Sequence, residues 1–423
     1  MDDELRRLRA EKHRAYQQLQ ASERPRVEVC TQCQQPSFKT EVCPKSGLYH
    51  NIKNKKLIGG HVIEGNIVNS AQLMAAIDST RVRWAASRTS LVRADAESLN
   101  IFQTFVQQMD GKVNRYGILY GLYKAEEKII EAHAVYEPEQ IGNEYAFLEQ
   151  KDPFLDTVDA VAAGLGLRRV GVVCTHPPRD NDVMLLNSRE LLLCAREQSC
   201  FGDECVLLTI AKNDKEGGVL ECQAWQASPQ CVHLYRLGVL HERAPRRRPA
   251  TGAATAAASP YNVDEEEEAE GIAQRSAHLQ NPEEARLVYS EVELEVAEEK
   301  TDAAGHRHFV SKLPSHTVDT RWFTSYVAVE QFQSSIVRGL FLRRNRPAMA
   351  PPTMANLRNY MKDPKRQKDS FAEKLADFHV LVFLAETLSM SDDMPTLIEI
   401  ARTRKMTPAA QNYEMLLDAY MQS

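Results

Sequence analysis

The sequence predicts a mixed α+β protein: a central domain of interleaved strands and helices, then a C-terminal domain that begins with strands and ends with helices. Three observations support this prediction. Short runs of β-forming residues alternate with helical periodicity between residues 106 and 243. Apolar residues recur every three or four positions after about residue 371. Between them, residues 244–285 combine a basic Pro-rich stretch, an Ala/Thr tract and an acidic run, which predict a disordered linker or loop.

The composition limits the classes of protein to consider. The 423 residues suffice for two or three domains, and a hydrophobic content of 43% suffices for a real core. A net charge of −6 argues against a nucleic-acid-binding protein that relies on overall basicity. The charged N-terminus lacks the apolar stretch of a secretory signal, and no apolar run is long enough for a transmembrane segment. With nine cysteines, we therefore expect a soluble intracellular protein with reduced thiols or metal ligands.

The N-terminal region divides into three predicted parts. Residues 1–25 predict an exposed, charged helix, because strong helix formers occur over 1–20 without Gly or Pro. Residues 26–55 form a degenerate zinc-finger-like segment with the spacing C-x2-C-x9-C-x6-H, made of Cys30, Cys33, Cys43 and His50. These residues suit a structural zinc site, and the alternative is a loop with reduced surface thiols. Residues 56–105 are expected to be an insertion or extension with one helix around 71–86.

The central domain, residues 106–243, has a regular succession of elements. β-Forming residues predict strands at 116–120, 129–135, 170–174, 206–212 and 218–226. Helical spacing predicts two helices, at 156–167 and 187–197. Asn187 or Ser188 is the expected N-cap of the second helix.

The C-terminal domain is expected over residues 286–423. Its first part is rich in β-formers. Helical spacing then relates Phe371, Leu375, Phe378 and Val382. A further amphipathic helix is predicted over 392–404, so these helices are expected to share one core.

One motif carries metal chemistry in a known superfamily. Val173-Cys-Thr-His-Pro-Pro178 resembles the metal-binding segment of the MPN (JAMM-type) superfamily, whose active members read His-Ser/Thr-His-Pro. Two histidines and a downstream Asp hold zinc there, and an upstream Glu is the general base. Of the four positions, only His176 matches; the others are Asn114 for the Glu, Cys174 for the first His and Ser188 for the Asp. The resemblance therefore implies an MPN-like α/β sandwich without catalysis, in which His176 either binds a metal or ends a strand as an ordinary histidine.

Six strings of residues, in this order, are similar to the nuclear protein localisation protein 4 family. They are Arg115-Tyr-Gly-Ile-Leu-Tyr-Gly-Leu-Tyr123, Ala134-Val-Tyr-Glu-Pro-Glu-Gln-Ile-Gly142, Gly164-Leu-Gly-Leu-Arg-Arg-Val-Gly-Val-Val173, Ser228-Pro-Gln-Cys-Val232, Leu375-Ala-Asp-Phe-His-Val-Leu-Val-Phe-Leu384 and Ile400-Ala-Arg-Thr-Arg404. The second and third strings are the most specific. The resemblance spans about residues 115–404, with a gap over the linker.

This resemblance implies an adaptor. Members of the family pair with ubiquitin fusion degradation protein 1 and deliver polyubiquitylated clients to the valosin-containing AAA ATPase for extraction and unfolding before proteasomal degradation. They act in the cytoplasm and nucleus and peripherally at the endoplasmic reticulum membrane. An unfolded ubiquitin strand can lie in a groove on the MPN and C-terminal domains. The groove candidates in this sequence are Tyr136, Glu137, Gln140 and Gly142. A structural turn around Pro138 is the alternative role for this string.

The sequence also departs from the family pattern. The ubiquitin-like domain that usually begins the chain is replaced by a short charged helix, and only Cys30 and Cys33 match a zinc finger, as its closing pair. We therefore expect a divergent or N-terminally shortened member. Two alternatives stay open: a metal-dependent deubiquitinase that uses Cys174 and His176 as rearranged ligands, and a scaffold that has lost ubiquitin binding.

Overall fold

The computed structural model describes residues 81–109, 112–177, 185–213, 219–242, 279, 281–301, 307–347 and 349–420. It also describes four short strands nearer the N-terminus, β1 (Glu28–Val29), β2 (Pro36–Ser37), β3 (Lys56–Ile58) and β4 (His61–Ile63). The chain forms two compact units. The larger comprises residues 83–235, 241–289 and 319–423, and the smaller includes 236–240 and 290–318.

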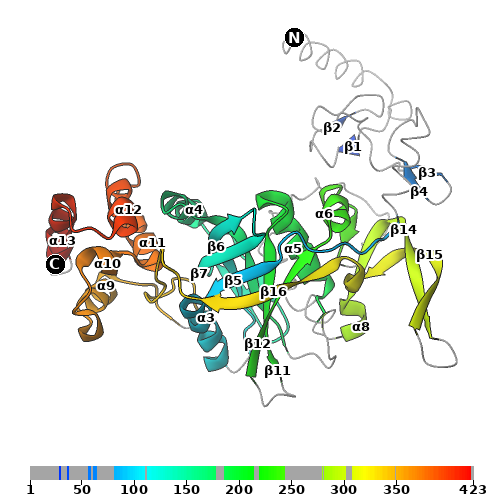
Figure 1. The fold of residues 1–423 in the computed structure, drawn as a ribbon, viewed down its shortest axis with the longest axis horizontal. Helices are drawn as coiled ribbons and strands as arrows, with labels where there is room; N and C mark the ends of the chain where they lie inside the picture. The colour runs from blue at the N-terminus through cyan, green and yellow to red at the C-terminus, as the bar shows by residue number, and fades with distance from the viewer. Residues whose placement is uncertain are drawn as a thin grey trace, which may run out of the picture. The chain divides into compact units, whose positions relative to one another are not determined.

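Seven strands of the larger unit close into a barrel in the order β10-β11-β12-β16-β5-β7-β6. They are β5 (Leu91–Asp95), β6 (Tyr116–Lys124), β7 (Ile129–Tyr136), β10 (Arg168–Thr175), β11 (Val206–Asn213), β12 (Val219–Ala227) and β16 (Thr324–Phe332). Neighbours are antiparallel except for the parallel pairs β10–β11, β16–β5 and β5–β7. Figure 1 shows β5 and β16 side by side, although more than two hundred residues separate them in the sequence.

Alternating side chains of these strands fill the barrel with aliphatic residues. The core includes Val92, Leu119, Ile130, Val173 and Val327, each at most 1% exposed. Burial of aliphatic side chains is the main stabilising term for such a sheet, at about 1.5–3 kcal/mol each. Closure also removes the open edges that would otherwise pair with other chains.

Helices pack on the barrel. Helix α3 (Ala96–Gln108) begins at Asp95, whose side chain accepts from the backbone N–H of Ser98, and it contributes Leu99 and Phe102 to the core. Helix α5 (Ser188–Phe201) packs against β10, β11 and β12. Asn187 caps it in a reciprocal capping box with Glu190, as the sequence predicted. Helix α6 (Pro229–Arg236) follows β12, and β8 (Gln140–Gly142) and β9 (Phe147–Glu149) form a hairpin after β7.

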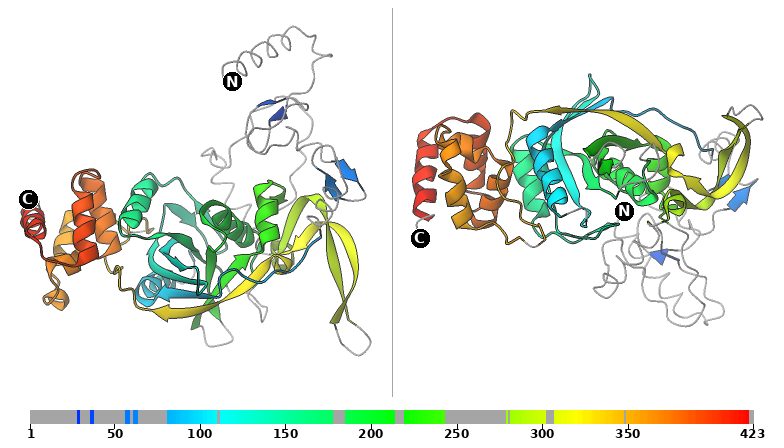
Figure 2. Two further views of the ribbon diagram at one scale, coloured as in Figure 1. Left: turned by 45° about the horizontal axis from the view of Figure 1, so that its top comes forward. Right: turned by 90° about the horizontal axis from the view of Figure 1, so that it is seen from below.

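The C-terminal helices pack as one group, drawn in orange to red in Figure 2. They are α9 (Met354–Met361), α10 (Phe371–Leu375), α11 (Phe378–Thr387), α12 (Met394–Thr403) and α13 (Pro408–Tyr420). Helix α4 (Leu155–Gly164) packs against α11 and α12, so the barrel and these helices share one unit. A Cβ added to Gly164 would lie 2.9 Å from the terminal methyl group of Ile398, so any larger residue there would displace that side chain.

Asp377 divides the periodic stretch after Phe371 into two helices. Its buried carboxylate caps α11 by accepting from the backbone N–H of His379 at 3.0 Å. The other oxygen accepts from Leu340 N at 2.7 Å, Phe341 N at 3.0 Å and Tyr360 Oη at 2.8 Å. Asp377 therefore fastens the crossover segment, defined here as residues 333–353 between β16 and α9, to the helices.

Part of the predicted organisation requires correction. The mixed α+β class is confirmed, but the strands form a closed barrel where an α/β sandwich was expected. The barrel takes β5 from the predicted insertion at 56–105 and β16 from the predicted C-terminal domain, so the boundaries at 106 and 286 do not coincide with those of the units. These two strands complete the barrel by long-range pairing, which local periodicity does not reveal.

The helix expected around 71–86 is absent from its described part, residues 81–86. Backbone groups there form long-range bonds instead: Val82 N donates to Glu295 O at 3.0 Å, and Arg83 N donates to Gln230 Oε1 at 3.1 Å. Residues 71–80 and the predicted helix at 1–25 lie outside the described residues.

The smaller unit is built mainly on a three-stranded sheet in the order β13-β14-β15. Its strands are β13 (Leu240–His241), β14 (Leu287–Thr301) and β15 (Arg307–Asp319), and the short helix α8 (Pro282–Ala285) precedes β14. The turn η3 (Thr320–Trp322) leads from β15 into β16, and η4 (Pro364–Arg366) follows α9. Among all the helices described here, none is long and apolar enough to cross a bilayer.

Candidate functional site

The degenerate centre consists of the four positions that the MPN resemblance assigns to catalysis: Asn114, Cys174, His176 and Ser188. The structure brings Asn114 next to the end of β10. Thr175 Oγ1 donates to Asn114 Oδ1 at 3.1 Å and accepts from the backbone N–H of Arg115 at 2.8 Å. Asn114 is 4% exposed, and an uncharged amide in this position has no basic group with which to take a proton from water.

The other three positions are buried as well. The Nδ1–H of His176 donates to the carbonyl oxygen of Pro177 at 2.8 Å. Ser188 Oγ donates to the carbonyl oxygen of Glu242 at 3.3 Å, and a hydroxyl in this position lacks the charge of a carboxylate ligand. The described residues contain no group of three His, Cys, Asp or Glu side chains that could hold a metal ion. The donor set at the degenerate centre therefore does not fit a catalytic zinc.

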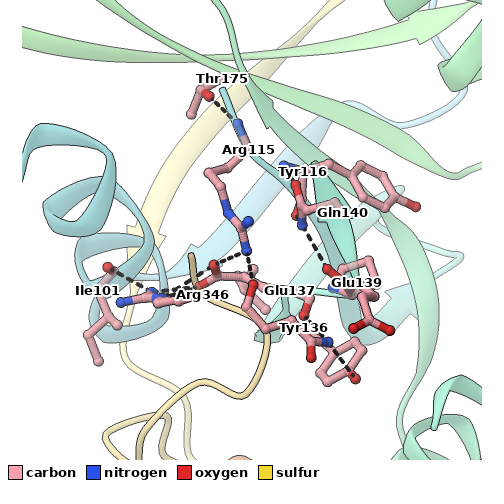
Figure 3. Close-up of polar contacts among 12 residues, drawn as sticks. Ile101, Arg115, Tyr116, Tyr136, Glu137, Glu139, Gln140, Thr175 and Arg346 are labelled. Carbon is pink, nitrogen blue, oxygen red and sulfur yellow. Dashed lines mark hydrogen bonds and ion pairs between the residues drawn. The ribbon is translucent and has the colours of Figure 1, made fainter. Parts of the chain in front are cut away.

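The β8–β9 hairpin closes over Asn114. The backbone N–H of Asn114 donates to Asn143 O at 2.8 Å, and a Cβ added to Gly142 would lie 2.1 Å from the carbonyl oxygen of Asn114. The Gln140 amide pairs with both backbone groups of Tyr116, since Oε1 accepts from Tyr116 N and Nε2 donates to Tyr116 O, each at 2.7 Å (Figure 3). Gln140 thus satisfies the start of β6 as a neighbouring strand would.

Glu137 lies at the centre of a buried ion-pair cluster with Arg115 and Arg346, as Figure 3 shows. Arg115 Nη2 donates to Glu137 Oε2 at 2.9 Å, and Arg346 Nη2 donates to Glu137 Oε1 at 2.5 Å. The side chains of Arg115 and Glu137 are each 1% exposed. Burial by itself raises the pKa of Glu137, but the adjacent guanidinium of Arg346, followed by that of Arg115, brings its pKa below the ordinary value.

Tyr136 belongs to the same buried region. Its hydroxyl donates to Asp152 Oδ2 at 2.7 Å, and the side chain of Asn345 donates to Glu137 O at 3.2 Å and to Asp152 at 3.1 Å. Burial, followed by the charge of Asp152, raises the pKa of the Tyr136 hydroxyl, which therefore stays protonated. At the residue before Tyr136, Val135 O accepts a hydrogen bond from His379 Nε2 at 3.0 Å, which joins α11 to the end of β7.

These contacts change what the groove candidates can do. Tyr136 and Glu137 are each 2% exposed, so their side chains support the hairpin and the crossover segment from beneath. Gln140 and Gly142 are half-buried against residues 114–116. The exposed apolar group of the hairpin is Ile141, at 49%. A ligand on this face would meet Ile141, while the predicted residues hold the hairpin in place.

Sequence reasoning missed Arg346 and Asn345. They lie more than 200 residues after Tyr136 and Glu137, in an irregular segment without a helical or strand pattern. The available signal was the basic string at residues 343–346. Arg is the residue best suited to a buried, bidentate pair with a carboxylate, and that property pointed to a structural partner. The predicted zinc ligands Cys30, Cys33, Cys43 and His50 lie outside the described residues.

Comparison with known proteins agrees with the motifs. The model of the NPL4 family matches residues 115–250, which run from β6 through β13. The predicted resemblance to the NPL4 family is confirmed. An "NPL4-like protein" from Oryza sativa subsp. japonica is 25% identical over 334 residues, which cover 77% of this chain and 67% of the relative. The human "Nuclear protein localization protein 4 homolog" is 24% identical over 319 residues, or 68% of this chain and 47% of that protein.

The similarity to the NPL4 family extends beyond the matched domain. The Dictyostelium discoideum "Nuclear protein localization protein 4 homolog" is 29% identical over a shorter stretch of 145 residues, 34% of this chain and 24% of that protein. The rice and human alignments cover more of the chain than the 136-residue family match, so they include residues beyond it. The NPL4-like segment contains three of the four degenerate positions, all except Asn114, and all four groove candidates.

Proposed function

We propose that this chain is a non-catalytic, ubiquitin-binding cofactor of the AAA ATPase segregase. It would hold polyubiquitylated clients while the ATPase extracts and unfolds them before proteasomal degradation, including degradation at the endoplasmic reticulum. The fold that would carry this function is an MPN-like domain in which the degenerate centre no longer cuts ubiquitin. The proposed partners are polyubiquitin, ubiquitin fusion degradation protein 1 and the valosin-containing AAA ATPase.

The observation that carries the proposal is the environment of Asn114. An amide stands where a hydrolase of this type requires a carboxylate base. Gly142 and Asn143 of the hairpin lie directly against the Asn114 backbone, so the side that would need the base is packed against the hairpin and carries an amide instead. The hairpin that packs on Asn114 exposes Ile141, and an exposed aliphatic residue held in this way is a suitable contact for an apolar patch of ubiquitin.

The resemblance to the NPL4 family supports the segregase and its partner proteins as the setting for this activity. The zinc-finger-like segment at 26–55 belongs to the same proposal, since Cys30, Cys33, Cys43 and His50 would hold a structural zinc. A non-enzymatic role is consistent with the donor set described above.

The experiment measures retention of polyubiquitin chains by the immobilised full-length chain. Ile141→Asp places a charge at the centre of the proposed contact, and we expect it to weaken retention at least tenfold. Val219→Asp is the matched control, because Val219 is an aliphatic strand residue that is 60% exposed on β12. It should bind as the unmodified chain does.

Two outcomes would contradict the proposal. If the unmodified chain does not retain polyubiquitin, this chain does not bind ubiquitin in the absence of other proteins. Equal retention by Ile141→Asp and Val219→Asp would show that the hairpin is not the contact surface. Circular dichroism of both variants confirms that a loss of retention does not come from unfolding.

A further inference from the structure

The Glu137 latch, defined as Arg115, Glu137, Asn345 and Arg346, connects three segments that are distant in the sequence. Arg115 precedes β6, Glu137 follows β7 and the other two residues lie in the crossover segment. Arg115 Nη2 donates to both Glu137 Oε2 and Asn345 O, each at 2.9 Å. One carboxylate therefore holds the barrel and the crossover segment together.

The latch is electrostatic and has little access to water. Glu137 faces two guanidinium groups, which also lie over the ring of Phe105 on α3, with Arg115 at 5.6 Å and Arg346 at 4.4 Å from its centroid. Arg346 Nη2 donates in addition to Ile101 O at 3.2 Å. Without the negative charge of Glu137, two buried cations would face each other around one aromatic ring, an arrangement that destabilises the local structure.

The latch also sets the base of the hairpin. Glu137 is followed by Pro138, and Glu139 N donates to Asp152 Oδ2 at 3.3 Å, the same oxygen that accepts from Tyr136 and Asn345. The entry and exit of the β8–β9 hairpin therefore meet the crossover segment at one point. The crossover segment is in turn held to the C-terminal helices through Asp377.

We propose that Glu137 is a positioning residue that fixes the β8–β9 hairpin relative to the crossover segment, and so presents Ile141 for ubiquitin binding. The binding half of this proposal rests on the proposed function. The positioning half concerns the chain alone and is tested separately.

The experiment is hydrogen exchange of the full-length chain and of Glu137→Gln, a variant of nearly the same shape without the charge. Peptides covering 338–347 and 139–150 should exchange at least tenfold faster in the variant, while β11 residues 206–213 should exchange as before. Glu131→Gln is the matched control: Glu131 is also on β7 and pairs with Lys124 and Arg93, but at the barrel surface. It should leave both peptides unchanged.

The polyubiquitin retention assay completes the test. Glu137→Gln should retain chains at least tenfold more weakly, and Glu131→Gln should retain them normally. Unchanged exchange at 338–347 would overturn the latch. Faster exchange with unchanged retention would overturn the positioning role. If the unmodified chain retains no polyubiquitin, the proposed function fails, whereas the exchange data still decide the latch.

If Glu137→Gln does not fold, the same exchange measurement on Arg346→Lys tests the latch instead. Lysine keeps the positive charge but lacks the planar fork that donates to both oxygens of Glu137, from Nη2 to Oε1 and from Nε to Oε2. The same two peptides should exchange faster, with 206–213 unchanged. Exchange at the normal rate in this variant would overturn the latch.

Discussion

Replacement of Asp377 by Ala should be one of the most damaging single changes in the C-terminal helices. The carboxylate is fully buried and accepts from four backbone N–H groups and one tyrosine hydroxyl. Alanine removes every one of these acceptors. The donors of the crossover segment and of Tyr360 would then lie in the interior without partners.

The magnitude follows from these contacts. Loss of a helix N-cap costs about 1 kcal/mol. Each buried donor that loses its acceptor costs about 1–3 kcal/mol, reduced where the structure relaxes or water enters. We therefore expect Asp377→Ala to lower the free energy of unfolding by about 3–5 kcal/mol, a large part of the roughly 5–15 kcal/mol typical of a domain.

Urea unfolding followed by circular dichroism measures this loss. With a slope of about 2–3 kcal/mol per molar urea, the midpoint should fall by about 1–2.5 M. Asp363→Ala is the matched control, because Asp363 caps the short turn η4 at a half-buried position and accepts mainly from Lys365 N. It should cost about 1 kcal/mol or less.

The reasoning would be refuted if Asp377→Ala and Asp363→Ala shifted the midpoint equally. That result would mean that the crossover segment does not depend on the carboxylate. Asp377→Asn, which keeps one acceptor oxygen, should fall between the two.

Two further predictions concern pH and close packing. Burial lowers the pKa of His379 well below its ordinary value, so the folded protein holds this histidine in its neutral form. The free energy of unfolding should therefore fall as the pH drops below about 6.5, by about 1.4 kcal/mol per pH unit. Urea midpoints at pH 7.5, 6.5 and 5.5 measure this slope, and His379→Gln should reduce it. Gly142→Ala should lower stability by about 1–3 kcal/mol, because the new methyl group meets the carbonyl oxygen of Asn114; an unchanged melting temperature would mean that the hairpin is not packed on Asn114.

The sequence predicted the features that depend on local pattern. The strands expected at 116–120, 129–135 and 206–212 correspond to β6, β7 and β11, and Asn187, one of the two expected caps, caps α5. These features depend on neighbours within a few residues, which a single sequence contains directly.

Long-range partners could not be predicted in this way. Periodicity treats residues 371–382 as one helical stretch, but Asp377 ends the pattern because its partners Leu340 and Phe341 come from another segment. The groove candidate Glu137 is buried because Arg346, 209 residues further on, neutralises it. No local signal relates a carboxylate to so distant a cation.

Retention and cleavage of polyubiquitin, measured on one gel, test the central claim most directly. The purified chain is incubated with polyubiquitin chains, with and without a metal chelator, and bound and free chains are separated. We predict that chains are retained at full length in both conditions. Shortened chains that disappear when the chelator is added would contradict the account, because Asn114, Cys174 and Ser188 would then support catalysis.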